Sequence, residues 1–181
     1  MVQSDIIVRK ATLEDLEYKA SAYLTVNDAY RSKGGWTTEE DIVSGPRCTE
    51  EDIEKFIREN GNPNTLLFAI KQTNEGSSVV GTVQIQPCED HENEAEIGLF
   101  SVSPFEQSRG IGGKLMQAAM NEMKELGFTH AVLHVLENRP DILAWYRKLG
   151  FVETGERLPF QWPEKLKIKD LHFLVMKKPL A

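Results

Sequence analysis

The sequence predicts an α+β (mixed α/β) fold built on a mixed, mostly antiparallel sheet. An apolar run with the composition of a strand, residues 95–102, is followed by a glycine-rich loop at residues 107–113. The next segment, residues 114–126, has apolar side chains at helical spacing. Two β-rich runs earlier in the chain flank a turn-rich stretch, which is typical of an antiparallel hairpin. These observations predict one parallel strand pair, joined by a helix, within an otherwise antiparallel sheet.

The N-terminal third predicts a strand and two helices. Residues 6–9 are β-branched and short, as expected of a first strand, and Thr12 would cap a helix ending near residue 30. A second helix begins at Thr49 and is amphipathic. The breaker cluster at residues 60–63, Asn-Gly-Asn-Pro, marks its end.

Strands dominate the rest of the chain. The hairpin comprises residues 65–71 and 79–86, and an acidic loop at residues 88–94 leads into the central strand. The elements expected after residue 126 are a strand at 131–136, a short helix at 141–149, a strand from 151, a loop at 156–170 and a final strand at 171–177. Since no repeat or linker divides the chain, we expect one domain, residues 1–181.

The glycine loop predicts a phosphate site. Glycines at 110, 112 and 113 let the backbone approach a ligand closely, and the following helix adds the positive end of its dipole. A Walker loop is excluded because Ser108 stands where its first glycine belongs and no Ser or Thr follows the lysine. The dinucleotide fingerprint fails because Leu115 replaces its third glycine. A metal-free pyrophosphate remains.

The segment Gln107-x-Arg109-Gly110-x-Gly112 resembles the Q/R-x-x-G-x-G/A signature of the GNAT superfamily of acyl-CoA-dependent N-acyltransferases. In that family this loop binds the pyrophosphate of coenzyme A. Further family features stand in order around it, ending in AWYRKLGF at residues 144–151, and the match is best over residues 79–154. The resemblance implies a GNAT-like sheet of six to seven strands with helices on both faces. It also implies a splayed parallel strand pair that holds the donor, acetyl-CoA.

The resemblance assigns cofactor-binding residues to three places. These are Phe100, Ser101 and Val102 through their backbone, Gln107, Ser108, Arg109, Gly110, Ile111, Gly112 and Gly113 in the loop, and Asn138 after the next strand. Asn138 matches an asparagine that often bonds the pantetheine amide. Arg139-Pro140 follows it where relatives have small residues, so the register there stays open.

Attack of an amine on a thioester needs a proton acceptor, a stabilised oxyanion and a proton for the departing thiolate. The resemblance implies that Glu96 is the base, because AEIxxxxV matches the strand that carries the glutamate of the histone acetyltransferase branch. The alternatives are a solvated strand residue or a water chain involving Glu92 or Glu94. Tyr146 is implied as the acid that protonates the coenzyme A sulfur; the alternative is a core aromatic.

The acceptor side is less defined. The candidates are Tyr30, Arg31, Trp36, Arg47, Phe160 and Trp162. Aromatic side chains beside acids suit a cationic amine, but exposed aromatics could equally form a homodimer contact.

Composition excludes several classes of partner. The formal charge of −7 argues against nucleic-acid binding, and neither an apolar run of about 20 residues nor a signal peptide is present, so we expect no membrane association and a cytoplasmic, or else nuclear, protein. Cys48 and Cys88 are expected to be plain thiols. His130 and His134 are four apart, which suits metal ligation on a helix, but they lie in a predicted strand, so we expect no metal.

The sequence therefore predicts an N-acetyltransferase that moves an acetyl group from acetyl-CoA to a primary amine by direct attack in a ternary complex. A small-molecule amine is the expected acceptor. A protein lysine or N-terminus is the alternative acceptor, and a non-catalytic acyl-CoA-binding domain is the alternative function. The presence of both Glu96 and Tyr146 favours the enzyme.

Overall fold

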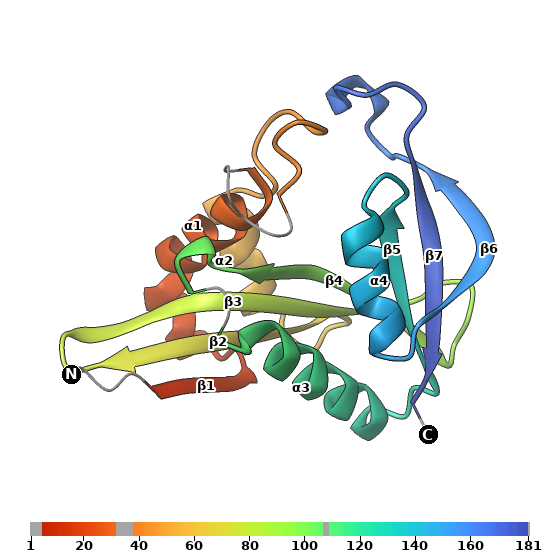
Figure 1. Ribbon diagram of the computed structural model, residues 1–181. Coiled ribbons are helices and arrows are strands. Elements are labelled where there is room, and N and C mark those ends of the chain that lie inside the picture. Colours follow the sequence, from red (N-terminus) through yellow and green to blue (C-terminus); the bar gives the residue numbers. More distant parts are fainter. Residues whose placement is uncertain (1–4, 32–37, 107–108, 181) are drawn as a thin grey trace.

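The structure, a computed structural model, describes residues 5–31, 38–106 and 109–180. Its centre is a seven-stranded sheet in the order β1-β2-β3-β4-β5-β7-β6 (Figure 1). The strands are β1 (Asp5–Lys10), β2 (Thr65–Thr73), β3 (Gly76–Pro87), β4 (Glu94–Val102), β5 (His130–Leu136), β6 (Val152–Pro159) and β7 (His172–Pro179). Only β4 and β5 pair in parallel, and all other described neighbours are antiparallel. The predicted α+β class is confirmed.

Helices cover both faces of the sheet. They are α1 (Lys19–Arg31), α2 (Glu50–Arg58), α3 (Ile111–Glu125) and α4 (Pro140–Lys148), with 3-10 turns at Leu13–Tyr18, Pro104–Glu106 and Pro163–Lys165. One core cluster packs α3 and α4 against the sheet, and a second packs α1 and α2 against the other face. The longest described helix, α3, has 15 residues, and none of the described helices is long and apolar enough to cross a membrane.

The apolar residues whose spacing predicted α3 form the surface that the helix buries. The side chains on that surface are Ile111, Leu115, Met116, Ala119, Met120 and Met123. Burying a side chain of this size stabilises the fold by about 1.5–3 kcal/mol. The helix begins at Ile111, three residues before the predicted start, because Gly110 adopts a φ of 74° and ends the preceding loop there. Gly112 and Gly113 therefore lie inside the first turn of the helix.

The predicted loop at 156–170 is wrong in its first part. β6 continues to Pro159 and pairs with β7 up to the contact between Pro159 and His172. β6 is an edge strand and almost all of its residues are exposed, so it lacks the alternation that reveals a half-buried strand. Proline is tolerated at its end because an edge strand does not need every N–H for pairing.

The parallel pair is short and then separates. The register pairs Glu94 with His130, Ala95 with Ala131, and Glu96 with Val132, where pairing ends. Beyond that point β5 continues beside β7 while β4 continues beside β3, so the two strands diverge (Figure 1). The predicted splayed pair is thus present.

A β-bulge in β4 lies just beyond the point of separation. The register with β3 shifts between Gln84–Gly98 and Thr82–Ser101, and Leu99 has a φ of 48°. The Thr82 hydroxyl donates to the Leu99 carbonyl at 2.6 Å and lies 2.6 Å from the Ser101 hydroxyl, which must then be the donor in that contact. This buried network holds the bulge in place.

Candidate active site

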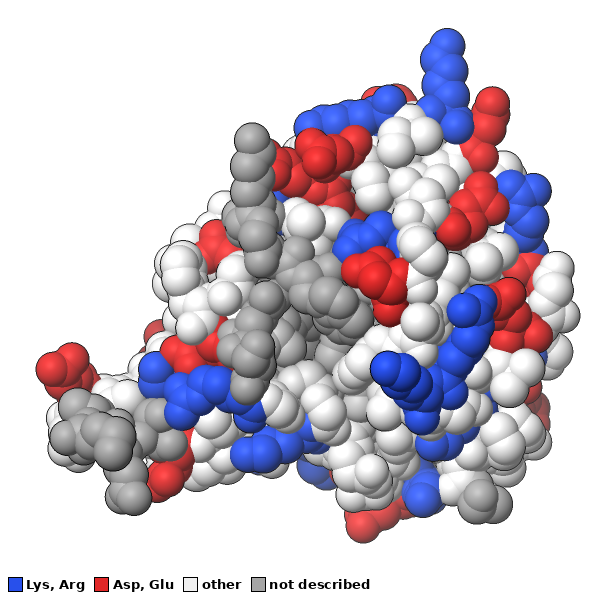
Figure 2. Space-filling view, viewed as in Figure 1, with Lys and Arg blue, Asp and Glu red and all other residues white. Residues whose placement is uncertain are grey.

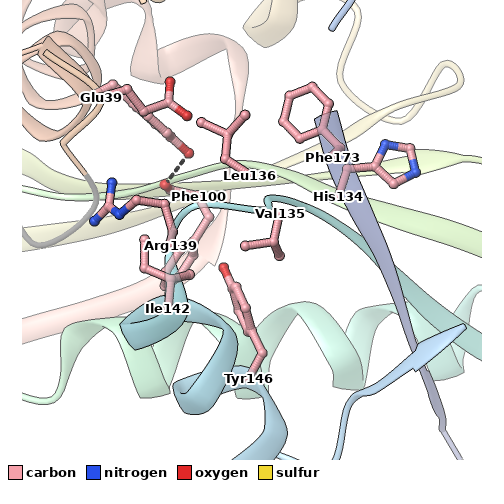
Figure 3. A pocket seen from close by; sticks show the side chains of 10 residues that line it. Glu39, Phe100, His134, Val135, Leu136, Arg139, Ile142, Tyr146 and Phe173 are labelled. Atoms are coloured by element: carbon pink, nitrogen blue, oxygen red, sulfur yellow. Dashed lines mark hydrogen bonds between the residues drawn. The ribbon is translucent and has the colours of Figure 1, made fainter. Parts of the chain in front are cut away.

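A pocket lies where β4 and β5 separate (Figure 3). Its lining residues are Tyr30, Glu39, Phe100, His134, Val135, Leu136, Arg139, Ile142, Tyr146 and Phe173. Tyr30, Phe100 and Tyr146 had been predicted as site residues from the sequence. Glu39, His134 and Arg139 had not been predicted to take part.

Tyr146 enters the pocket from α4. Its ring packs edge-on against Phe151, with centroids 5.8 Å apart, and only 6% of the residue is exposed. Figure 3 shows its hydroxyl end directed toward Val135. Burial raises the pKa of Tyr146 well above its usual value, with a smaller contribution from Tyr30. No described residue hydrogen-bonds this hydroxyl, so the phenol is a protonated donor available to a ligand.

Glu96 and His134 form a pair across the start of the gap. Glu96 Oε1 lies 3.1 Å from His134 Nδ1, and the two side chains are 27% and 29% exposed. Glu96 occupies the last rung of the parallel ladder, and His134 lies two residues beyond its partner Val132 on the same face of β5. Within the described ranges, no group of three or more His, Cys, Asp or Glu side chains is placed to hold a metal.

The first turn of α3 presents backbone N–H groups that precede the helical ladder. The first bond of that ladder runs from the Lys114 N–H to the Gly110 carbonyl at 3.1 Å, and no described side chain caps the helix. A Cβ on Gly112 would lie 3.3 Å from Phe100 Cζ, whereas a Cβ on Gly113 would meet nothing within 4 Å. Ile111 contributes its side chain to the core. This turn can accept an anion through its backbone.

Basic side chains lie beside this turn. Arg109 and Lys71 donate to the two carboxylate oxygens of Glu106, at 2.7 and 2.6 Å. Burial would raise the pKa of Glu106, but these hydrogen bonds outweigh it and hold the pKa below its usual value. Gln107 and Ser108, two of the predicted cofactor residues, lie outside the described residues.

Side chains of α1 and α4 contact the strand predicted to bind pantetheine. The Tyr30 hydroxyl donates to the Phe100 carbonyl at 2.5 Å, drawn as the dashed line in Figure 3. The Phe100 ring stacks on Trp145 with centroids 5.8 Å apart. Ser101 is fully buried and Val102 packs against the core next to Phe100. Because a carbonyl has two lone pairs, the bond from Tyr30 leaves the Phe100 oxygen able to accept from a ligand.

Asn138 lies in the exposed turn between β5 and α4. It is not among the residues that line the pocket, whereas its neighbour Arg139 is. The Arg139 guanidinium donates to the Thr38 carbonyl and lies 3.7 Å from Asp141. Arg139 therefore anchors the start of the segment that follows residue 37 against the rim of the pocket.

Two segments meet beside the acceptor candidates. Val43 and Leu166 form a β-bridge, and the Lys167 N–H donates to the Ile42 carbonyl at 2.7 Å. Both segments pack on the Leu136 end of β5, which is part of the pocket. Figure 1 shows them converging from opposite sides of the molecule above the gap.

The acceptor candidates lie around these segments. The Arg47 guanidinium lies 5.3 Å above the Tyr30 ring, and Phe160 stacks on Phe173 at 5.5 Å. Arg31 pairs with Glu39 at 3.0 Å. Trp162 is 53% exposed, and Trp36 lies outside the described residues. On the face drawn in Figure 2, acidic and basic side chains of the described residues are interspersed.

Comparisons with known proteins agree with this architecture. Residues 35–151 match the sequence profile of the acetyltransferase (GNAT) family. Human N-acetyltransferase 8B is 26% identical over 149 residues, which is 80% of this chain and 62% of that protein. The chain thus spans less than two thirds of the length of this curated relative.

Two solved structures show the same fold. An N-acetyltransferase from Staphylococcus aureus Mu50 superposes with a TM-score of 0.69 and 19% identity, covering 98% of this chain and 99% of that one. The spermidine/spermine N-acetyltransferase SpeG from Vibrio cholerae gives a TM-score of 0.65 and 17% identity, covering 97% and 92%. At these identities the likeness concerns the fold alone. The profile match over more than half of the sequence shows that the chain belongs to the acetyltransferase (GNAT) family.

Proposed function

We propose that the protein is an acetyl-CoA-dependent N-acetyltransferase that acetylates a primary amine by direct attack within a ternary complex. The observation that carries this proposal is that a proton donor and a proton acceptor lie around one gap. The phenol of Tyr146, which no described residue bonds, reaches the pocket from α4, and the Glu96–His134 pair lies at the start of the gap on β4 and β5. A non-catalytic binding domain would have no use for either group.

The surroundings of the gap suit the donor. The N–H groups of the first turn of α3 would hold the pyrophosphate, with the side chains of Arg109 and Lys71 close by. Gly112 lets this turn lie close to β4, because even a methyl group there would press on Phe100. β4 leaves β5 after Glu96, so the backbone of Phe100, Ser101 and Val102 faces a gap in which the pantetheine arm can lie. This set of residues fits acetyl-CoA.

The chemistry follows from these positions. The amine nitrogen attacks the thioester carbonyl and loses a proton. The Glu96–His134 pair accepts this proton, and the negative charge of Glu96 favours its transfer. The C–N bond forms, the tetrahedral intermediate collapses and the C–S bond breaks. Tyr146 gives its phenolic proton to the departing sulfur, which avoids release of a bare thiolate.

The acceptor is proposed to be a small amine that carries positive charge away from its reacting nitrogen. Glu39 lines the pocket, Glu96 contacts the lining residue His134, and the protein has a net charge of −7. The bridge between Val43 and Leu166 narrows the approach over the pocket. A narrow approach favours a small amine over a loop of a folded protein, and the net negative charge favours a cationic one.

The test is release of free thiol from acetyl-CoA in the presence of panels of amines, amino acids, polyamines, aminoglycosides and lysine peptides. We expect turnover with a small cationic amine and little with the peptides. Turnover with peptides alone would overturn the small-molecule assignment. Silence across all panels, with coenzyme A binding still detected by calorimetry, would overturn the catalytic function and leave an acyl-CoA-binding domain.

A further inference from the structure

We propose that His134, and not Glu96, accepts the proton from the attacking amine, and that Glu96 is the positioning residue that orients the imidazole. This inference rests on the proposed acetyltransferase function and names the atom that takes the proton. The observation behind it is the 3.1 Å contact between Glu96 Oε1 and His134 Nδ1 at the edge of the pocket.

The backbone places this pair with little freedom. The three rungs of the parallel ladder hold Glu96 opposite Val132, and β5 is held along its other edge by β7 from His130 to Leu136. His134 is thus displaced from Glu96 by one two-residue step along the same face. It lies just beyond the last rung of the parallel ladder, and its side chain lines the pocket beside Phe173 (Figure 3).

The contact selects one tautomer of the imidazole. The negative carboxylate 3.1 Å from His134 Nδ1 favours the tautomer with its hydrogen on that nitrogen, and the lone pair is then on Nε2. When Nε2 takes a proton, the imidazolium stays in contact with the Glu96 carboxylate, which stabilises the charge. The same contact means that one oxygen of Glu96 is already engaged, which makes the carboxylate a poorer direct base.

Other charged groups near His134 are paired with one another. Glu94 forms an ion pair with Lys177 at 2.7 Å on the neighbouring strands, and Glu39 pairs with Arg31. From β7, His134 meets the ring of Phe173 at 6.3 Å and has Val175 as its register partner. The further titratable groups at the site are Tyr30 and Tyr146 of the pocket and Cys88. Burial, and then the charge of Glu96, raises the pKa of the Cys88 thiol. Glu96 is the anionic group with an ion-pair contact to His134.

Protons balance over one turnover in this scheme. Nε2 of His134 takes the proton that the nitrogen loses as the C–N bond forms, and the electron pair of the C–S bond leaves on sulfur. Tyr146 protonates that sulfur and becomes a phenolate. Solvent then carries the proton from the imidazolium to the phenolate, and both groups return to their starting states.

The experiment compares His134→Gln with His130→Gln. His130 is a matched control because it lies on the same strand, bonds Thr129 at 2.9 Å and is outside the pocket lining. We expect His134→Gln to lower kcat/KM by roughly 10²- to 10⁴-fold, the usual scale of a general base, while His130→Gln changes it little. The loss in His134→Gln should shrink as the pH rises toward about 9, because a larger fraction of the amine is then already neutral. Calorimetry with coenzyme A and thermal melting verify that each variant is folded.

Rescue of activity by added imidazole distinguishes a proton-accepting His134 from one that is only structural. His134→Ala should regain activity with added imidazole, and this rescue should be absent in Glu96→Gln, which retains its own imidazole. Nitrogen NMR of the wild-type protein should show the hydrogen on Nδ1 of His134, and Glu96→Gln should weaken that preference. Wild-type turnover with an unchanged His134→Gln rate, or loss without rescue by imidazole, would refute His134 as the proton acceptor. Absence of turnover in the wild type itself would instead refute the proposed function.

Discussion

Gly112 offers a sharp test of the donor site because the next residue supplies its own control. A Cβ at position 112 would lie 3.3 Å from Phe100 Cζ and 3.8 Å from Val102 Cγ2, whereas a Cβ at Gly113 would meet nothing within 4 Å. Gly112→Asp therefore puts a carboxylate against the strand that is proposed to bind pantetheine. It also adds a negative charge to the turn that is proposed to bind pyrophosphate.

The size of the effect follows from the charges. Two like charges about 5 Å apart at an effective dielectric constant of about 20 repel by about 3 kcal/mol. Salt reduces this value, so we take about 1.4 kcal/mol, a tenfold loss of affinity, as the minimum for Gly112→Asp. Gly112→Ala should lose less, because it keeps only the contact with Phe100. Gly113→Ala should keep its affinity and gain about 0.5–1 kcal/mol of stability, since alanine suits a helix better than glycine does.

Calorimetry with coenzyme A at low and high salt measures these differences, and urea denaturation reports the stability of each variant. The loss in Gly112→Asp should shrink as salt rises, while the smaller loss in Gly112→Ala should not. A folded Gly112→Asp protein with unchanged affinity would refute the placement of the pyrophosphate on this turn. Equal losses in the variants at Gly112 and Gly113 would refute the expectation that only a side chain at Gly112 disturbs the donor site.

Three further predictions concern the pocket and its support. Tyr146→Phe should lower kcat, with little change in melting temperature or coenzyme A affinity, because no described residue bonds the hydroxyl; a drop in melting temperature at full activity would contradict this. Burial raises the pKa of Tyr30 to about 12 and that of Tyr146 further. An unfolded tyrosine ionises near pH 10, so the free energy of unfolding by urea should fall as pH rises above about 10, and less steeply in Tyr146→Phe; identical slopes would argue against burial of the phenol. Gly81→Ala puts a Cβ 2.7 Å from Leu115 Cδ1 and should cost about 1–3 kcal/mol of stability, measured by urea denaturation with Gly113→Ala as control.

The elements with a strong local signal were predicted well from the sequence. α3 has its apolar residues on one buried surface, and β2 and β3 pair as the expected hairpin across the turn between Thr73 and Gly76. The proposed roles of the glycine loop and Tyr146 also come from the order of motifs along the chain. Each of these signals lies within a short stretch, so neighbouring residues alone carry it.

Features that depend on a partner strand were missed. The exposed edge strand β6 has no periodic pattern, so its last residues were taken for a loop. The bulge at Leu99 was invisible because the segment Ala95 to Val102 has the composition of an uninterrupted strand, and the bulge depends on Thr82 of β3. Arg139 was noted only as a departure from the expected motif, but it lines the pocket and bonds the Thr38 carbonyl.

The sequence by itself predicted the succession of strands and helices, and the turn proposed to bind the pyrophosphate and the proposed acid Tyr146 were also named from it. The tertiary structure alone decided that His134 stands beside Glu96, because that contact depends on the register of two parallel strands joined by α3. Pairing with β7 from His130 to Leu136 holds β5 along its other edge, and a shift of one residue would turn His134 to the other face of the sheet. No local pattern of residues encodes that alignment, so the partner of Glu96 became visible only in the folded protein.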